Sequence, residues 1–137
     1  MGVVCLKINV IYIPRVYCYD RGTSPPTTPS CLYYRWQRKL WDLFIKRTDF
    51  NFIWKAGPRS SNLEDPIKML KASNIRYSTR KLSKELKKAD IAIVDVASTP
   101  MMEAVLAGKK VICVIDQIDN EYVRWDAIYD LGESVIF

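Results

Sequence analysis

Two short, almost continuous apolar runs, separated by one helical segment, constrain the fold of this chain more than any other feature. The runs are DIAIVDV at 90–96 and KVICVID at 110–116, and the segment between them, PMMEAVLAG at 100–108, ends on a glycine that suits a helix C-terminus. Strands this apolar are typical of parallel sheets, where both faces are covered. The pattern therefore predicts a parallel β-α-β unit with a right-handed crossover.

The rest of the chain continues this alternation. Strands are expected at 3–13, 50–54, 75–79 and 134–137, and helices at 31–47, 63–73, 84–89 and 123–132. The order of these elements predicts an α/β fold, a Rossmann-like three-layer sandwich with a mostly parallel sheet of about five or six strands. A length of 137 residues suits one domain, so residues 1–137 are expected to form a single unit.

The net charge indicates which kinds of partner the protein could bind. The 21 Lys and Arg residues exceed the 15 Asp and Glu residues by six, which favours anionic partners such as phosphates, nucleic acid or an acidic membrane surface.

The chain has no histidine, and its four cysteines form no CxxC pair, so we expect no zinc site. No signal peptide pattern opens the sequence and no run reaches the roughly 18–20 apolar residues of a membrane span. We therefore expect a cytoplasmic protein with reduced thiols.

Ligands of open parallel sheets bind at the carboxyl ends of the strands. The loops expected at those ends are 14–30, 55–62, 77–83, 97–100 and 116–121. Ordinary loop polarity explains any single residue there, but the loops together are rich in cations and hydroxyls. The candidates are Arg15, Arg21, Lys55, Arg59, Arg80, Lys81, Ser98 and Thr99.

The turn before helix 100–108 has two possible explanations. Pro100 suits the first helical position, which makes Thr99 the N-cap and places Glu103 fourth, one residue beyond the position of a capping-box carboxylate. Glu103 could simply stabilise the helix dipole, by about 0.3–1 kcal/mol. Alternatively, Ser98, Thr99 and the free N–H groups hold a diphosphate, and Glu103 accepts hydrogen bonds from a ribose.

The segment LSKELKKADIAIVDVASTPMMEAVLAGKKVICVID, 82–116, resembles the C-terminal nucleotide-binding half of GT-B glycosyltransferases, above all those of surface-carbohydrate, capsule and teichoic-acid biosynthesis. FIWKAGPR, 52–59, is similar to a strand and turn of the same enzymes. Gly57 and Lys110 depart from the pattern, because histidine and proline are usual there. If that histidine contacts phosphate or acts as an acid, this chain lacks the group. The matching residues are Lys55, Pro58, Arg59, Asp90, Asp95, Ser98, Thr99, Glu103, Ala104, Gly108, Lys109, Val111 and Ile112.

The resemblance implies the donor-nucleotide-binding domain of a glycosyltransferase-like enzyme of cell-surface carbohydrate biosynthesis, such as lipopolysaccharide or capsule. The donor would be a UDP- or CDP-linked sugar, and the acceptor a glycan or a lipid-linked precursor. Neither a metal nor a cofactor is implied, nor a nucleic acid, and no catalytic residue is identified. The implied roles are Glu103 on the ribose, Ser98 and Thr99 on the diphosphate, Lys55 and Arg59 near phosphate charge, residues 77–82 with Arg80 along the base, and Arg15 and Arg21 facing the cleft.

GT-B enzymes have two Rossmann-like halves, and the acceptor site and usually the catalytic base come from the N-terminal half. This sequence matches only the other half. The resemblance therefore implies a domain that binds a donor without turning it over alone. An N-terminal domain or a partner subunit would complete the enzyme, and the inner face of the membrane is one expected location.

Two other interpretations of the sequence remain open. Nucleoside deoxyribosyltransferase-like domains have a similar length and a related pattern with a catalytic glutamate, but this chain lacks their glycines around Glu103 and has an additional strand at 74–78. A non-catalytic module of the receiver or flavodoxin type would also contain a strand like DIAIVDV. The acidic pair expected after the first strand of a receiver is missing from IYIPRVY.

Overall fold

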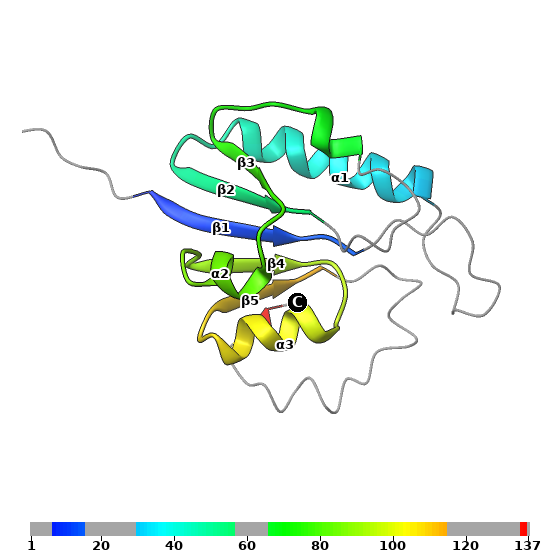
Figure 1. Cartoon of the computed structure of the whole chain (residues 1–137). Helices are drawn as coiled ribbons and strands as arrows, with labels where there is room; N and C mark the ends of the chain where they lie inside the picture. Colours follow the sequence, from blue (N-terminus) through cyan, green and yellow to red (C-terminus); the bar gives the residue numbers. More distant parts are fainter. Residues whose placement is uncertain (1–6, 16–29, 57–65, 115–134, 137) are drawn as a thin grey trace, which may run out of the picture.

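A computed structural model describes residues 7–15, 30–56, 66–114 and 135–136 of the chain. Its strands form one sheet in the order β3-β2-β1-β4-β5-β6, and every neighbouring pair is parallel. Figure 1 shows the sheet between helices on either side. The strands are β1 (Ile8–Ile13), β2 (Phe50–Lys55), β3 (Ile75–Ser78), β4 (Ile91–Val94), β5 (Lys110–Cys113) and β6 (Val135–Ile136). The α/β, Rossmann-like prediction is confirmed.

Three helices and one 3₁₀ turn complete the described structure: α1 (Ser30–Ile45), η1 (Pro66–Met69), α2 (Leu82–Leu86) and α3 (Thr99–Leu106). The helix expected at 63–73 is wrong in the part described, because only a 3₁₀ turn starting at Pro66 forms there. The helix expected at 84–89, for which Ser83 is the N-cap that the sequence suggests, begins earlier, with Lys81 at the N-cap position. The helix expected at 123–132 lies outside the described residues.

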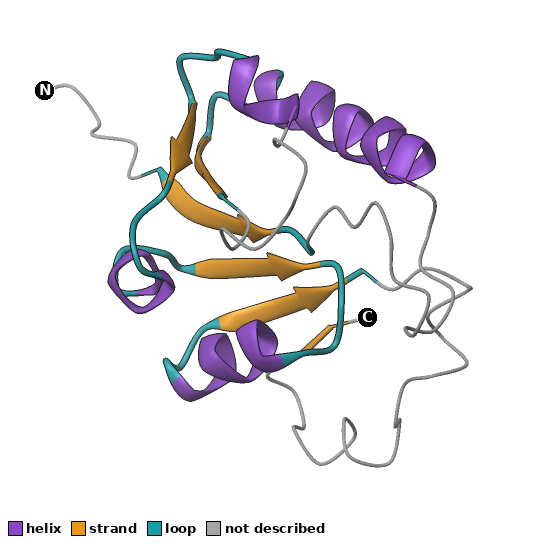
Figure 2. Ribbon diagram, turned by 45° about the vertical axis from the view of Figure 1, so that its right-hand side comes forward, coloured by secondary structure: helices purple, strands orange, loops and turns teal. Residues whose placement is uncertain are grey.

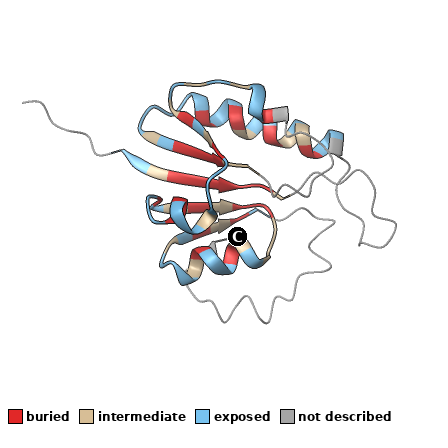
Figure 3. Ribbon diagram, in the orientation of Figure 1, coloured by how far each residue is buried: buried red, intermediate tan, exposed pale blue. Residues whose placement is uncertain are grey.

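The two faces of the sheet have separate apolar cores. Helix α1 and η1 pack on one face, where Tyr12, Trp41 and Trp54 are buried. Helices α2 and α3 pack on the other face around Ile11, Ala92 and Met101 (Figure 2). Figure 3 shows that burial follows the central strands through most of their length. This alternation of faces along each strand is the period-2 geometry of a sheet covered on both sides.

The buried side of α1 differs from the sequence prediction. The helical spacing of apolar residues favours a buried face of Leu32, Trp36, Leu40, Leu43 and Phe44. Phe44 is buried, and Trp36 and Leu40 pack partly buried against the core, but Leu32 and Leu43 are 52% and 56% exposed. The structure also buries Tyr33, Gln37 and Trp41, so the buried face is turned by up to about one residue, which is roughly 100°. The side chains of Tyr33 and Gln37 thereby reach hydrogen-bond partners at the sheet. Hydrophobic spacing alone cannot predict this stabilisation.

The strand order places a topological switch point between β1 and β4. The chain leaves β1 towards α1 on one face and leaves β4 towards α3 on the opposite face. Connections that diverge in this way open a crevice at the carboxyl ends of the two strands, where doubly wound sheets bind their ligands. Of the helices in the described ranges, none is both long and apolar enough to cross a membrane.

Candidate functional site

A buried carboxylate joins the two strands that flank the switch point. Asp95, directly after β4, is 5% exposed and accepts three hydrogen bonds through its two oxygens. The Tyr12 hydroxyl of β1 donates to Oδ2 at 2.8 Å, and the Arg15 backbone N–H donates to Oδ1 at 2.7 Å. The Tyr33 hydroxyl of α1 also donates to Oδ2. Asp95 thus connects β1, β4 and α1 at one point.

Gln37 adds a second set of hydrogen bonds to this cluster. Its Nε2 group donates to the hydroxyl oxygens of Tyr33 at 2.8 Å and Tyr12 at 3.3 Å. Each tyrosine hydroxyl can accept from the amide and donate its own proton, and Asp95 accepts from both. A carboxylate surrounded by donors is the arrangement in which a buried acid is satisfied.

Burial and hydrogen bonding act on these groups in opposite directions. Burial is the larger effect on Asp95 and raises its pKa above the ordinary 3.8, although the bonds from Tyr33 and Tyr12 and the charge of Arg15 lower it. Burial followed by the Asp95 charge raises the pKa of both tyrosines, so both hydroxyls keep their protons. The tyrosines are therefore permanent donors at neutral pH.

The same cluster positions Arg15. Its backbone N–H is held by Asp95, and its guanidinium carbon lies 4.7 Å from the centre of the Tyr33 ring. Stacking of a guanidinium on an aromatic ring is worth about 0.5–1 kcal/mol at an exposed site. The predicted cleft residue Arg15 thus lies at the switch point, beside the loop that leads from Asp95 to α3.

Helix α3 begins one residue earlier than predicted. Ser98, with φ −143° and ψ −175°, is the N-cap, so the expectation that Thr99 caps the helix is wrong. Thr99 is the first helical residue and Pro100 the second, because proline is accepted in a first turn, where its missing N–H needs no partner. The Ser98 side chain makes no capping hydrogen bond, so its hydroxyl is not used to stabilise the first turn of the helix.

Glu103 is an exposed residue in the second turn of α3. Its side chain has no hydrogen-bond or ion-pair partner among the residues that the structure describes, and only its backbone oxygen accepts, from Ala107 N–H at 3.0 Å. With α3 starting at Thr99, Glu103 is fifth in the helix, further from a capping-box position than predicted. The predicted role of its carboxylate in binding a ribose stays a prediction.

Lys55 and Arg80 gather at a different point, around buried Glu85 of α2. Lys55 Nζ donates to the Ala56 carbonyl at 2.9 Å, and burial lowers its pKa while the charge of Glu85 raises it. Arg80 helps to lower the pKa of Glu85. With strands about 4.8 Å apart, β2 and β3 are displaced from β4 by roughly 10 and 14 Å. Only an extended ligand would contact both these cations and Ser98.

Arg21 and Arg59 lie outside the described residues, so their predicted roles stay predictions. The structure brings Arg15, Ser98 and Thr99 to the switch point and leaves Lys55 and Arg80 further along the same edge of the sheet. Sequence reasoning assigned no role to Tyr12, Tyr33 or Gln37, and used Asp95 only as a matching position. The sequence signal that could have identified Asp95 as part of the site is an acidic residue directly after an apolar strand.

No protein-family model matches this chain, and no curated protein matches it significantly. The geometry is therefore the basis for any functional conclusion.

Proposed function

We propose that the carboxyl edge of the sheet binds the diphosphate of a nucleotide-sugar, as the donor-binding domain of a glycosyltransferase-like enzyme. One observation carries the proposal: the switch point between β1 and β4 brings together Arg15, the start of α3 and a rigid bridge through Asp95. Doubly wound sheets bind nucleotides at this place.

The chemistry of the three groups suits a diphosphate. The amino end of α3 has a partial positive charge, and the uncommitted hydroxyl of Ser98 together with that of Thr99 offers further donors. Arg15 adds a full positive charge that is restrained by its stacking on Tyr33. Restraint favours binding because less side-chain entropy is lost when the ligand arrives.

Exposed Glu103 supports a ribose contact one helical turn beyond the phosphates. A turn of helix rises about 5.4 Å, which is close to the separation of phosphate and ribose within one nucleotide. In the complete enzyme, the proposed reaction transfers a glycosyl or polyol-phosphate group from a UDP- or CDP-linked donor to a glycan or lipid-linked acceptor. Helix N-termini and cations would stabilise the leaving diphosphate.

Calorimetric titration with UDP, CDP and GDP tests this proposal. We expect micromolar-to-millimolar binding of a pyrimidine nucleotide that Glu103→Gln weakens by about ten-fold, since a hydrogen bond to a charged group contributes about 1.5–3 kcal/mol. Asp42→Asn is the matched control, because Asp42 is an exposed carboxylate on α1. Folded protein that binds none of the three nucleotides at millimolar concentration would contradict the proposal.

A further inference from the structure

A second polar site lies on the sheet face away from α1. A groove of about 520 Å³ crosses the start of β1, β2 and β3 and extends to the segment after α2. Its volume is within the range of about 300–1,000 Å³ that small-molecule sites occupy. The residues that line it are Asn9, Asn51, Phe52, Ile53, Ser73, Asn74, Arg76, Arg80 and Lys88.

The described residues that line this groove include three cations and no acid. Arg76, Arg80 and Lys88 contribute the positive charge, whereas Glu85, the nearest acid of α2, is buried and occupied by other partners. The surrounding segment 76–90 holds six cationic and two acidic residues, which extends the positive potential beyond the wall of the groove. A site with this charge attracts anions.

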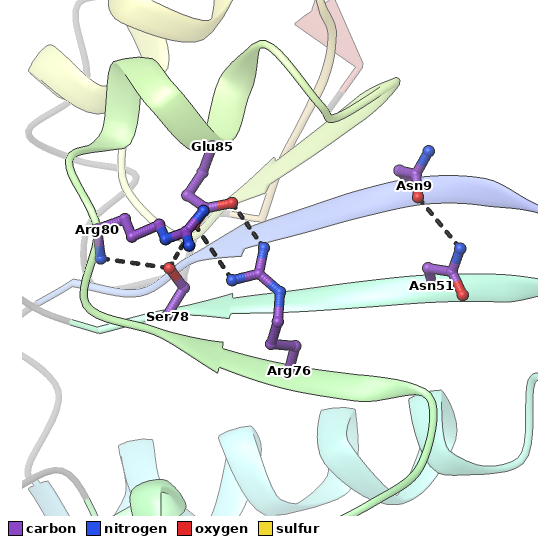
Figure 4. Close-up of polar contacts among 6 residues, drawn as sticks. All are labelled: Asn9, Asn51, Arg76, Ser78, Arg80 and Glu85. Carbon is purple, nitrogen blue, oxygen red and sulfur yellow. Dashed lines mark hydrogen bonds and ion pairs between the residues drawn. The ribbon is translucent and has the colours of Figure 1, made fainter.

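The cation in the middle of the groove is held in place by the protein itself. Arg76 donates to both oxygens of Glu85, at 3.2 and 2.7 Å, and Ser78 Oγ donates to the same carboxylate at 2.6 Å. The bond from Arg76 is the main reason that the pKa of Glu85 falls to about 2. Figure 4 shows Arg76 bonded to this carboxylate and the Arg80 backbone N–H donating to Ser78 Oγ, at 3.3 Å. Since Arg76 remains 49% exposed and has five N–H groups, part of its fork still faces the groove.

The floor of the groove offers amides in a set orientation. Asp90 Oδ2 accepts from the backbone N–H of Asn9 at 2.8 Å and from its side-chain amide at 3.3 Å, and Asn9 Oδ1 accepts from Asn51 Nδ2 at 3.2 Å. The two amides lie side by side on β1 and β2 (Figure 4). Asn51 is exposed, and its Oδ1 atom and second N–H are the kinds of group that bind hydroxyls.

We infer that this groove binds a sugar or polyol that carries two or more phosphate groups. The cations match phosphates, and the amides of Asn9 and Asn51 match hydroxyls. Single-stranded nucleic acid fits less well, because Phe52, the one aromatic residue among the described lining, is buried and offers no ring for a base to stack on. Of the described residues that line the groove, Arg80 alone also belongs to the predicted nucleotide site, so this inference does not depend on nucleotide binding at the strand ends.

Fructose 1,6-bisphosphate, pyrophosphate and fructose are suitable probes for calorimetry at low salt. We expect the bisphosphate to bind more tightly than pyrophosphate and fructose not to bind. Arg80→Gln with Lys88→Gln should weaken both anions by about ten-fold or more, because charge-assisted bonds are lost. Asn51→Ala should weaken the bisphosphate by about three-fold to ten-fold and leave pyrophosphate unchanged, because only the sugar has hydroxyls for the amide.

The control variant is Lys39→Gln with Lys46→Gln, which removes the same charge from exposed positions on α1 and directly after it, on the opposite side of the sheet. Equal weakening by this control would show diffuse attraction and overturn the inference. Tighter binding of an oligodeoxythymidylate than of the bisphosphate would overturn it in favour of nucleic acid. Glu103→Gln should leave bisphosphate binding intact, because Glu103 is not among the residues that line the groove, so failure here and failure at the strand ends are separate results.

Discussion

The Tyr12 hydroxyl lies 2.8 Å from Oδ2 of Asp95, joining β1 to β4 where the strand order reverses. The two residues are 83 positions apart in the chain. Their bond is one of three that close the carboxyl edge of the sheet around a buried charge, so the geometry of the proposed phosphate site depends on it. The first two predictions concern this cluster.

Tyr33→Phe should lower the free energy of unfolding by about 1–3 kcal/mol, because Asp95 then keeps its burial and loses a donor. Urea unfolding followed by tryptophan fluorescence measures the change. Tyr34→Phe on the same helix is the control and should stay within about 0.5 kcal/mol, since Tyr34 is only partly buried. Equal effects of the two variants would show that the hydroxyl bond contributes nothing.

Asp95→Asn should change the pH dependence of stability in a defined direction. Burial raises the pKa of Asp95 above 3.8, so the folded state binds its proton more tightly than the unfolded state does. The contribution of Asp95 to the free energy of unfolding therefore declines as the pH rises from about 3.8 through the pKa of the folded protein. We expect the advantage of wild type over Asp95→Asn to shrink over that range. An advantage that grows instead would contradict the predicted effect of burial.

Glu85→Gln should show the opposite trend. The pKa of Glu85 falls from 4.5 to about 2, chiefly through its bonds with Arg76, so its contribution is complete above pH 4.5 and disappears as the pH falls to about 2. At neutral pH the variant should be less stable by about 1–3 kcal/mol. Asp42→Asn, which breaks an exposed pair with Arg38 at 3.5 Å, should cost only about 0–1 kcal/mol. Unfolding curves at pH 2, 4.5 and 7 test both variants.

Gly108 follows α3 with φ of +71°, a conformation that other residues adopt at a cost. A Cβ atom at this position would meet nothing within 4 Å, so Gly108→Ala adds backbone strain without a clash. We expect a loss of about 1–2 kcal/mol in the free energy of unfolding. Gly108→Asn should lose less, because asparagine tolerates this conformation. Equal losses for alanine and asparagine would point to a cause other than φ.

The strands at 91–94 and 110–113 were predictable because each carries its signal locally. Residues 91–94 and 111–115 are apolar without interruption, and the helix between them is followed by Gly108 as expected. The buried face of α1 was not predictable in the same way. Hydrophobic spacing favoured Leu32 and Leu43, but Tyr33 and Gln37 are buried because partners on the sheet satisfy their polar groups.

The candidate site was predicted only in part for the same reason. Arg15, Ser98 and Thr99 could be predicted as binding residues because they lie in loops that follow recognisable strands. The separation of Lys55 and Arg80 from them depends on strand order, since β3 and β2 precede β1 across the sheet. The bidentate pair of Arg76 with Glu85 has no comparable signal in the sequence, where both residues belong to an ordinary run of surface charge.

The alternation of strands and helices, the parallel sense of the sheet and the glycine after α3 follow from local sequence patterns, because each depends on residues within a few positions of one another. The strand order, the buried side of α1 and the enclosure of Asp95 and Glu85 could be found only from the three-dimensional fold. Those features depend on whether distant groups meet in a space that excludes water, where a polar side chain is stable only with its partners in place.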